Sequence, residues 1–270
     1  MAGVVGLVGT GLIGASIGLA ARSLGWHVVG CDVDATALRD AQDVRAIDEI
    51  VERREIYDCA DVVVIAAPLD ATLVEIERLR SERPARPRLL IDVASVKEPV
   101  ARAAADIAHF VPTHPMAGSE RTGALAARGD LFENRTWAYV ASGDPDSERR
   151  TVEFAGELGA LPVQVEAAEH DRIVAMTSHL PQLIATLFSA RLRSGSDANV
   201  DALCGPAARE LLRLGRSDYS LWRPIFEHNQ ANVSIEARAL AGELRAAADA
   251  LEAGHLDDVG AYFKQAREGV

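Results

Sequence analysis

The sequence contains little cysteine and almost no lysine. Its three cysteines lie far apart without C-x-x-C spacing, so they predict neither a disulfide framework nor a metal site, and are typical of reduced thiols in a cytosolic protein. Lysine occurs only at positions 97 and 264, so arginine carries nearly all of the positive charge. Compositional chance can explain this shortage, although it draws attention to Lys97.

Positive charge is itself in short supply. The 28 Lys and Arg residues face 40 Asp and Glu residues, a formal net charge of −12, and no predicted face gathers basic side chains. This balance argues against nucleic acid or a membrane surface as a partner, but it allows a local basic pocket for a small acidic substrate. No apolar run approaches the ~18 residues of a membrane-spanning helix, and no signal peptide precedes the first predicted strand. We therefore expect a soluble, cytoplasmic protein.

What the sequence does contain, at its very start, is a glycine-rich turn. The apolar run Val4–Val8 leads into Gly9, Gly11 and Gly14, which have the spacing G-x-G-x-x-G, and an amphipathic pattern follows from Leu12. This order predicts a strand, a tight turn and a helix. The first glycine allows the turn, the second lets a pyrophosphate approach, and the third permits close packing of helix and strand.

An acidic residue supports a dinucleotide site at this turn. Asp32 ends the next predicted strand, 18 residues after Gly14, near the distance of a carboxylate that binds an adenosine ribose. Asp34 is the better candidate to cap the helix that follows. The two carboxylates would repel a 2′-phosphate and no arginine follows before Arg39, which favours NAD over NADP. The expected cofactor contacts are Gly9, Thr10, Gly11, Leu12, Ile13, Gly14, Asp32, Ala67 and Pro68.

Predicted strands and helices alternate up to about residue 166. This order predicts an α/β Rossmann domain at 1–166, with a doubly wound and mainly parallel sheet, followed by an all-α domain at 167–270. A chain of 270 residues, 49% of them hydrophobic, can build both cores. The further strands are expected at 61–67, 88–93, 109–112, 136–140 and 161–165.

Ligands of such sheets bind beyond the carboxyl ends of the strands. That rule selects the turns 9–14, 66–70, 92–97 and 113–123 as candidate site segments. The last of these is the richest, because it gathers a histidine, hydroxyl groups, a carboxylate and glycines in one loop. A histidine in a loop is more often solvated or capped than catalytic, but the position of His114 favours a catalytic role.

The second half of the chain reads as helices. In the first, at 170–193, Pro181 removes one backbone hydrogen bond and should bend the helix near Ser178 and His179, unless a loop interrupts the helix there. Another helix is expected at 202–214, and a last long helix follows the segment 219–229. That last helix carries an apolar seam, which fits an intramolecular bundle or, as we favour, a homodimer. The seam residues are Val233, Ala237, Leu240, Leu244, Ala247 and Leu251.

Several motifs, in this order and over nearly the whole chain, resemble the prephenate/arogenate dehydrogenases, the cyclohexadienyl dehydrogenases of tyrosine biosynthesis. The resemblance implies NAD(P)-dependent oxidative decarboxylation of a cyclohexadienyl acid, without a metal, by a Rossmann domain joined to a helical dimerisation domain. The motifs are Gly9–Gly14, Asp92–Lys97, Thr113–Glu120, His170-Asp171 with Ser178–Pro181, and Leu221–Phe226.

The resemblance also implies roles for individual residues. His114 matches the base that takes the 4-hydroxyl proton, and Ser95 matches a serine that hydrogen-bonds this histidine near the nicotinamide. Arg213, five residues before Asp218, matches an arginine that clamps the ring carboxylate, and Arg209 matches a second arginine of that motif. The other implied substrate contacts are Ser119, Glu120, Ser178 and Gln182.

Alternatives remain open for the substrate and for the activity. Prephenate, converted to 4-hydroxyphenylpyruvate, is the expected substrate. Gln182 stands where many prephenate-using members have a histidine, so arogenate and 4-amino-4-deoxyprephenate are alternatives. A β-hydroxyacid dehydrogenase or imine reductase has a similar build, but those β-hydroxyacid enzymes use a lysine in the first helix of the α domain, and this helix has none. A non-catalytic NAD-sensing dimer is the third possibility.

Overall fold

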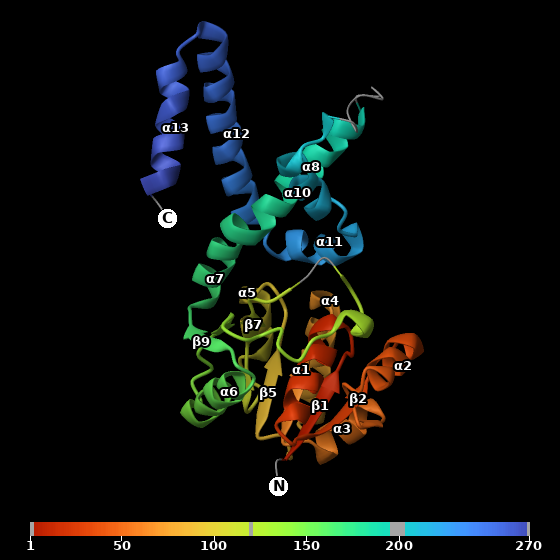
Figure 1. Cartoon of the computed structure of the whole chain (residues 1–270). Helices are drawn as coiled ribbons and strands as arrows, with labels where there is room; N and C mark the ends of the chain where they lie inside the picture. Colours follow the sequence, from red (N-terminus) through yellow and green to blue (C-terminus); the bar gives the residue numbers. More distant parts are fainter. Residues whose placement is uncertain (1–2, 119–120, 195–202, 269–270) are drawn as a thin grey trace.

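The predicted parallel sheet forms the centre of the first half of the chain. The computed structural model describes residues 3–118, 121–194 and 203–268. Six parallel strands lie in the order β3-β2-β1-β4-β5-β6, which is the doubly wound arrangement expected from the sequence (Figure 1). Their bounds are β1 Val4–Val8, β2 His27–Cys31, β3 Glu49–Ile50, β4 Val62–Ile65, β5 Leu89–Asp92 and β6 Phe110–Val111.

Helices cover both faces of this sheet and bury it. Strand β4 consists of four aliphatic residues, all buried, as a strand covered on both faces requires. One core cluster gathers Ile17 of α1 and Phe154 of α6 on one face, and a second gathers Ile56 of α3 and Ile76 of α4 on the other. The helices are α1 Leu12–Ser23, α2 Ala35–Asp43, α3 Arg53–Cys59, α4 Leu69–Glu82, α5 Glu98–Ala104 and α6 Pro145–Glu157.

The segment at residues 49–59 contains two elements that the sequence analysis did not predict. It forms the short strand β3 and the helix α3. A reciprocal capping box between Glu52 and Glu55 starts this helix, and Ile56 and Tyr57 bury its inner face. Seven residues are too few to show a helical period, so the pattern of polar residues hid the element.

The last three strands form a second, smaller sheet that the sequence did not separate from the first. Strand β7 (Thr113–Pro115) pairs antiparallel with β8 (Thr136–Tyr139), which pairs parallel with β9 (Leu161–Gln164). Pro112 lies between β6 and β7 and has no N–H for a continuous ladder, so the single strand expected at 109–112 ends and a new one begins in another sheet. A short 3-10 turn, η1 (Ala124–Ala126), packs on α1 and α2.

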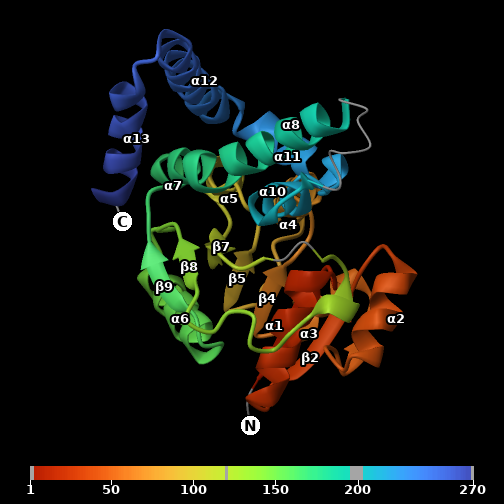
Figure 2. The same ribbon diagram turned by 45° about the horizontal axis from the view of Figure 1, so that its top comes forward.

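From Ala167 onward the described elements are helices. Helix α7 (Ala167–Val174), the π-helical turn η2 (Ala175–His179) and α8 (Leu180–Ser194) form one continuous rod. The bend expected at Pro181 therefore takes the form of a π-turn directly before it, where the wider turn accommodates the missing N–H, and no loop interrupts the helix. Figure 2 shows α7 and α8 crossing over the carboxyl end of the sheet.

The remaining helices complete the helical part. The single last helix expected from the sequence is two helices, α12 (Gln230–Ala253) and α13 (Leu256–Glu268), because Gly254 adopts a left-handed conformation with φ 75° and ends α12. Together they form a hairpin that projects from the rest of the chain (Figure 1). The two helices that precede the hairpin are α10, Pro206–Leu214, and α11, Tyr219–His228.

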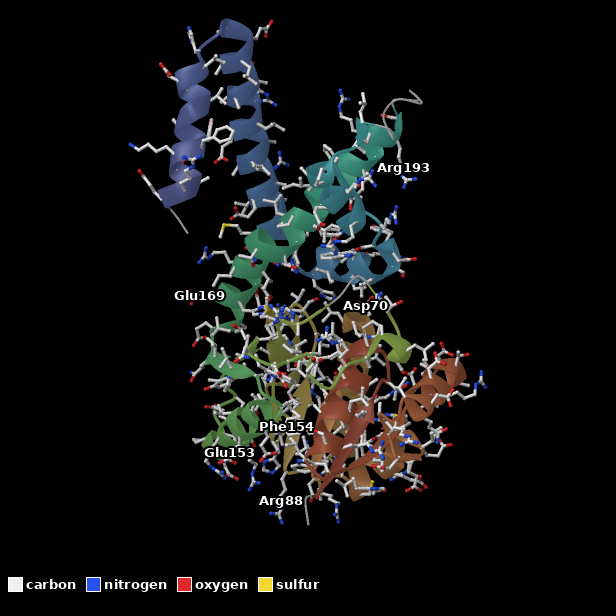
Figure 3. All side chains as sticks on the ribbon, in the orientation of Figure 1. Asp70, Arg88, Glu153, Phe154, Glu169 and Arg193 are labelled. Atoms are coloured by element: carbon white, nitrogen blue, oxygen red, sulfur yellow. The ribbon has the colours of Figure 1, made fainter. Side chains whose placement is uncertain are left out.

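The continuous helix Ala167–Ser194 was not expected to be as apolar as it is. Its mean hydropathy reaches 1.3 over an 18-residue window, so by length and composition alone it could cross a membrane. It nevertheless carries His170 and Asp171 in buried positions, and Asp171 is hydrogen-bonded to the Rossmann domain. Figure 3 marks Glu169 near its start, beside that domain, and Arg193 near its far end. We interpret it as the helix through which the helical domain packs against the Rossmann domain.

Candidate active site

A cleft at the carboxyl ends of β1, β2 and β4 matches the predicted dinucleotide site. It has a volume of about 840 Å³ and is lined by Gly9, Gly11, Asp32, Ala67 and Pro68, among other residues. Helix α1 begins beside it without any side-chain cap on its first N–H groups. These free N–H groups and the positive end of the helix dipole are suited to bind the phosphates of a dinucleotide.

Each of the three positions in the turn requires glycine for a different structural reason. Gly9 has φ 101°, and a Cβ there would lie 2.4 Å from the carbonyl oxygen of Ala66. A Cβ on Gly14 would lie 2.2 Å from the carbonyl oxygen of Gly9, so close packing excludes any side chain. Gly11 instead faces open space, because an added Cβ would meet none of the described residues beyond its chain neighbours within 4 Å. Its missing side chain leaves room for a ligand rather than for the protein, which fits a bound pyrophosphate.

Asp32 supports the turn as well as lining the cleft. One carboxylate oxygen accepts hydrogen bonds from Thr10 N at 2.7 Å and Thr10 Oγ1 at 3.3 Å, and the other accepts from Asp34 N at 3.0 Å. Thr10 is fully buried, so it acts as an anchor of the turn. Ile13 packs against the core, while Leu12 lines a second cleft. Asp34 caps α2 through Thr36 N, as expected.

His114 lies on β7, on a platform built from buried charges. Asp92, at the end of β5, accepts from Thr113 N at 2.9 Å and from Ala94 N at 2.8 Å. The ammonium group of Lys97, which is completely buried, donates to Asp92 and to the carbonyl oxygen of Thr113. The lysine singled out by its rarity is therefore the cation that joins β5, β7 and the start of α5 directly behind His114.

A chain of hydrogen bonds leads from His114 into the helical domain. His114 Nδ1 lies 2.9 Å from His170 Nε2, and His170 Nδ1 lies 2.8 Å from Asp171 Oδ1. Asp171 also accepts from the backbone N–H groups of Lys97, at 2.6 Å, and Glu98, at 2.8 Å, at the start of α5. Both His170 and Asp171 are almost fully buried. The α7 residues thus reach across the domain boundary and hold the candidate base.

The electrostatic surroundings keep His114 neutral. Burial lowers the pKa of His114 well below its ordinary value near 6.5, and the neighbouring His170, Lys97 and His179 act in the same direction. Burial also lowers the pKa of His179 to about 4, against the opposing charge of Asp171. A neutral imidazole can accept a proton, so His114 is in the protonation state that a general base requires.

The segment after His114 borders a second cleft. This cleft has a volume of about 760 Å³ and begins at Leu12, directly beside the glycine turn. Met116, Ala117 and Gly118 line it together with three arginines and two carboxylates, Asp130 and Glu133, and one of the arginines, Arg128, is paired with Asp130. A small acid bound there would meet both the start of α1 and the His114 loop. The predicted contacts Ser119 and Glu120 lie outside the described residues.

The other predicted site residues occupy several different environments. Ser95 lies in the turn before α5, but among the described residues no hydrogen bond joins it to His114, whose Nδ1 bonds His170. Ser178 lies partly buried on the π-turn. The Gln182 amide donates to Leu214 O at 2.9 Å, so it ties α8 to the end of α10.

The two predicted arginines lie on α10. Arg213 Nε donates to Glu210 at 3.2 Å, and the Arg213 side chain is 44% exposed. Arg209 Nε donates to the carbonyl oxygen of Cys204 at 3.1 Å. The geometry therefore leaves their roles as predictions.

Two groups of site residues escaped the sequence reading. His170 and Asp171 were noticed only as a motif, because their partner in the fold is 56 positions away in the sequence. Arg53 and Arg78, with Leu38, also line the nucleotide cleft, and Arg53 bonds the buried Glu75 at 2.7 Å. Two adjacent polar residues within an apolar helical pattern were the one signal for His170 and Asp171. No signal in the sequence marked Arg53, Arg78 and Leu38.

The sequence matches the family profile described as prephenate dehydrogenase, nucleotide-binding domain, at residues 17–158, and that described as prephenate dehydrogenase, dimerization domain, at residues 166–265. The chain belongs to the prephenate dehydrogenase family. This membership confirms the resemblance, the oxidoreductase class and the NAD-binding domain expected from the sequence.

Similar proteins agree with this assignment. The chain is 35% identical over 245 residues to the probable prephenate dehydrogenase NovF of Streptomyces niveus, covering 88% of this chain and 66% of that protein. It is 28% identical to the prephenate dehydrogenase of Bacillus subtilis, covering 97% of this chain and 74% of that protein. The chain thus spans just under two thirds of the first relative and about three quarters of the second.

Solved structures share the fold. The prephenate dehydrogenase of Aquifex aeolicus, in complex with hydroxyphenyl propionate and NAD+, superposes with a TM-score of 0.90 at 23% identity, over 99% of this chain and 96% of that one. The arogenate dehydrogenase of Synechocystis gives a TM-score of 0.80 at 23% identity, over 98% of both chains. These likenesses confirm the predicted fold class, a Rossmann domain followed by a helical domain.

Proposed function

We propose that the protein catalyses the NAD-dependent oxidative decarboxylation of prephenate to 4-hydroxyphenylpyruvate, in tyrosine biosynthesis in the cytoplasm. The observation that carries this proposal is the neutral, partly buried His114, because the loop that follows it lines a cleft that also includes Leu12, next to the glycine turn of the nucleotide cleft. Family membership supplies the class of reaction. The residues of the nucleotide cleft fit NAD, since Gly11 leaves open space and the Asp32 carboxylate lines the cleft.

In this reaction the side chains position the substrate and move one proton. When bound, NAD accepts the hydride from the ring carbon that carries the hydroxyl group. His114 takes the proton of that hydroxyl group, a role worth about 10²–10⁴ in rate. The C–C bond to the ring carboxylate breaks, carbon dioxide leaves, and its electron pair enters the ring, which becomes aromatic. The proton held by His114 returns to the phenol oxygen, so the proton balance closes.

The other predicted residues complete this proposal. Ser95 would contact the nicotinamide side of the site, and Ser178, Gln182, Ser119 and Glu120 would contact the substrate. An arginine on α10, Arg213 or Arg209, would bind the ring carboxylate, because a guanidinium can hold a carboxylate through two parallel hydrogen bonds.

The side chain separates prephenate from arogenate, and the ring substituent separates it from 4-amino-4-deoxyprephenate. Named relatives and neighbours include both prephenate and arogenate dehydrogenases, so the family alone leaves the two substrates open. Arogenate carries an amino acid side chain where prephenate carries a keto acid, and 4-amino-4-deoxyprephenate replaces the ring hydroxyl by an amine. We propose prephenate, with the other two as alternatives.

The test is NADH formation, followed by absorbance, with prephenate and with arogenate, each with NAD and with NADP. Turnover of prephenate with NAD supports the proposal. Turnover of arogenate alone keeps the mechanism and changes the substrate, and turnover only with NADP contradicts the role of Asp32. No turnover of either acid contradicts the proposed reaction and favours the amino analogue or a sensor.

His114→Asn provides the matched loss of function in this assay. We expect kcat to fall by about 10²–10⁴ because the proton acceptor is gone. NAD affinity, measured by fluorescence titration, should stay close to wild type, because His114 does not line the nucleotide cleft. His109→Asn is the control, since His109 is exposed and bonds Asp144 at 3.1 Å, away from the clefts. Retained turnover in His114→Asn would contradict the assignment of the base.

We also propose that the protein is a homodimer. The matched dimerization-domain profile supports this. So does the exposure of apolar side chains along the α12–α13 hairpin, where Leu244 is 70% exposed and Phe263 68% exposed.

A further inference from the structure

His170 lies between the candidate base, His114, and the Asp171 carboxylate. Neither His170 nor Asp171 contacts the substrate in the proposed reaction. His170 Nε2 faces His114 Nδ1 at 2.9 Å, and His170 Nδ1 faces Asp171 Oδ1 at 2.8 Å. His170 is 4% exposed and Asp171 1% exposed, so water cannot freely replace either partner. The donors and acceptors of this chain must therefore be consistent among the three side chains.

The ring protons of His170 and His114 can be assigned by starting from the Asp171 carboxylate. Both oxygens of Asp171 already accept backbone hydrogen bonds, from Lys97 N and Glu98 N, so this carboxylate is an acceptor toward His170 as well. His170 Nδ1 must then carry a proton and donate it to Asp171. In the neutral ring this leaves His170 Nε2 as an acceptor, and His114 Nδ1 must be the donor to it.

We propose that His170 is a positioning residue that holds His114 in the tautomer with the proton on Nδ1, so that Nε2 is the atom that accepts the substrate proton. This inference rests on the proposed function, because it assigns the proton-accepting atom of the same base. His114 Nε2 is available for this role, since no described residue bonds it and it is not among the buried side-chain atoms that lack a partner.

The arrangement also serves the protonated base. When Nε2 accepts the substrate proton, His114 Nδ1 keeps its proton and continues to donate to His170, so no hydrogen bond has to break. Asp171 is fixed by the start of α5 and by Asn229, whose amide donates to its carbonyl oxygen at 2.7 Å. A histidine side chain in water, in contrast, favours the tautomer with the proton on Nε2, and a protonated Nε2 cannot accept the substrate proton.

The hydrogen bonds that join His114, His170 and Asp171 cross the domain boundary, so the position of His170 depends on how the two halves pack. His114 belongs to the Rossmann half, on β7, whereas His170 and Asp171 belong to α7 of the helical half. The base is thus held in its active tautomer only while α7 lies against α5. A cofactor bound to the Rossmann half alone does not require this contact.

Two variants at position 170 test the kinetic consequence. His170→Phe keeps a ring but removes the acceptor, so we expect kcat to fall by about 10²-fold or more, as when a general base is lost or held in the wrong tautomer. His170→Gln can place its amide oxygen near the former Nε2, so it should recover a large part of that loss. NAD affinity and the KM of the acid should change little in both. His228→Phe is the matched control, because His228 bonds Asp70 across the domain boundary at 3.3 Å without contacting His114.

A measurement without turnover tests the tautomer directly. In protein labelled with 15N-histidine, ring nitrogen shifts distinguish protonated from unprotonated nitrogen, and the His114→Asn spectrum assigns the signals. We expect His114 to show a protonated Nδ1 and an unprotonated Nε2, and His170→Phe to shift the proton toward Nε2. A wild-type proton on Nε2, or a kcat of His170→Phe within about threefold of the control, overturns the proposal. Absence of wild-type turnover would instead overturn the proposed function, while the spectra would still decide the role of His170.

Discussion

At the scale of residues, the surroundings of His114 decide at which pH it can act. Burial lowers its pKa well below 6.5, and the neighbouring His170, Lys97 and His179 act in the same direction. The Asp171 carboxylate contacts His170 rather than His114, and Asp92 is paired with Lys97, so neither carboxylate reverses that direction. His114 is therefore expected to be the neutral acceptor across the whole neutral range.

The pH dependence of kcat/KM follows from this direction. A base is active above its pKa and loses activity as the pH falls through it, so a lowered pKa moves the acid limb to lower pH. We expect kcat/KM for prephenate to stay level from about pH 8 to pH 6.5 and to fall only below that range. Initial rates of NADH formation across this range give the profile. An acid limb centred at or above pH 6.5 would show that another group, or a charged His114, controls the reaction.

Lys97 and Asp92 form a completely buried ion pair whose removal should be costly. In Lys97→Met the Asp92 carboxylate loses its cation inside the protein, which typically destabilises a fold by about 3–5 kcal/mol. Urea unfolding, with a cycle of Lys97→Met, Asp92→Asn and the double variant, measures the coupling. We expect the double variant to lose much less than the sum of the two single changes. Additive losses would mean that Lys97 and Asp92 act independently.

At the scale of elements, the three glycines of the first turn should respond differently to one added methyl group. Gly14→Ala places a Cβ against the carbonyl oxygen of Gly9, so the folded protein should be strongly destabilised. Gly11→Ala meets no protein atom, so thermal unfolding without cofactor should be near wild type while NAD affinity falls by about tenfold or more. Thermal scans with and without NAD separate the two effects. Unchanged NAD affinity in Gly11→Ala would contradict phosphate binding at this turn.

The sequence predicts those elements that neighbouring residues determine, and it misses those that depend on contacts between distant parts of the chain. The glycine turn, the strands β1, β2 and β4 and the cap at Asp34 follow from residues that are neighbours in the chain, and the sequence alone predicts them. Helix α3 is too short to show a period. The separate sheet of β7 depends on pairing with β8, about 25 positions away, for which no local pattern exists.

The site shows the same division. His114 could be singled out from its loop, at the end of a strand where ligands of such folds bind. That His170 bonds it depends on the docking of α7 against α5, which no spacing in the sequence encodes. The Gln182 amide bonds Leu214, 32 positions away at the end of α10, which no spacing in the sequence predicts, and its contact with the substrate remains a prediction.

At the scale of the whole molecule, two halves meet where the chemistry is proposed to occur. The Rossmann half supplies the nucleotide cleft and His114, and the helical half supplies the residues that hold His114. Asp70 on α4, labelled in Figure 3, meets His228 on α11 at the same boundary. Each half therefore contributes to a single site, and the boundary at residues 166 and 167 remains our prediction for where they divide.

The α12–α13 hairpin projects away from this shared site, and its apolar face lacks a covering element within the described chain. Leu244 and Leu251 of the predicted seam are 70% and 56% exposed, whereas Val233, near the base of α12, is buried. The seam continues from the core of the domain into solvent. In a dimer, burying each such leucine would contribute about 1.5–3 kcal/mol.

Leu244→Arg should therefore weaken the dimer, because a charge would have to be buried or the interface opened. Light scattering after gel filtration should show wild type with the mass of two chains and the variant shifted toward one. Leu161→Arg is the control, since Leu161 is 53% exposed on β9, away from the hairpin. A dimeric Leu244→Arg would mean that a different face joins the chains. Helix α12 packs on α7, α8 and the π-turn, and α7 carries His170. If the partner's hairpin stabilises this packing, loss of the dimer should also lower turnover.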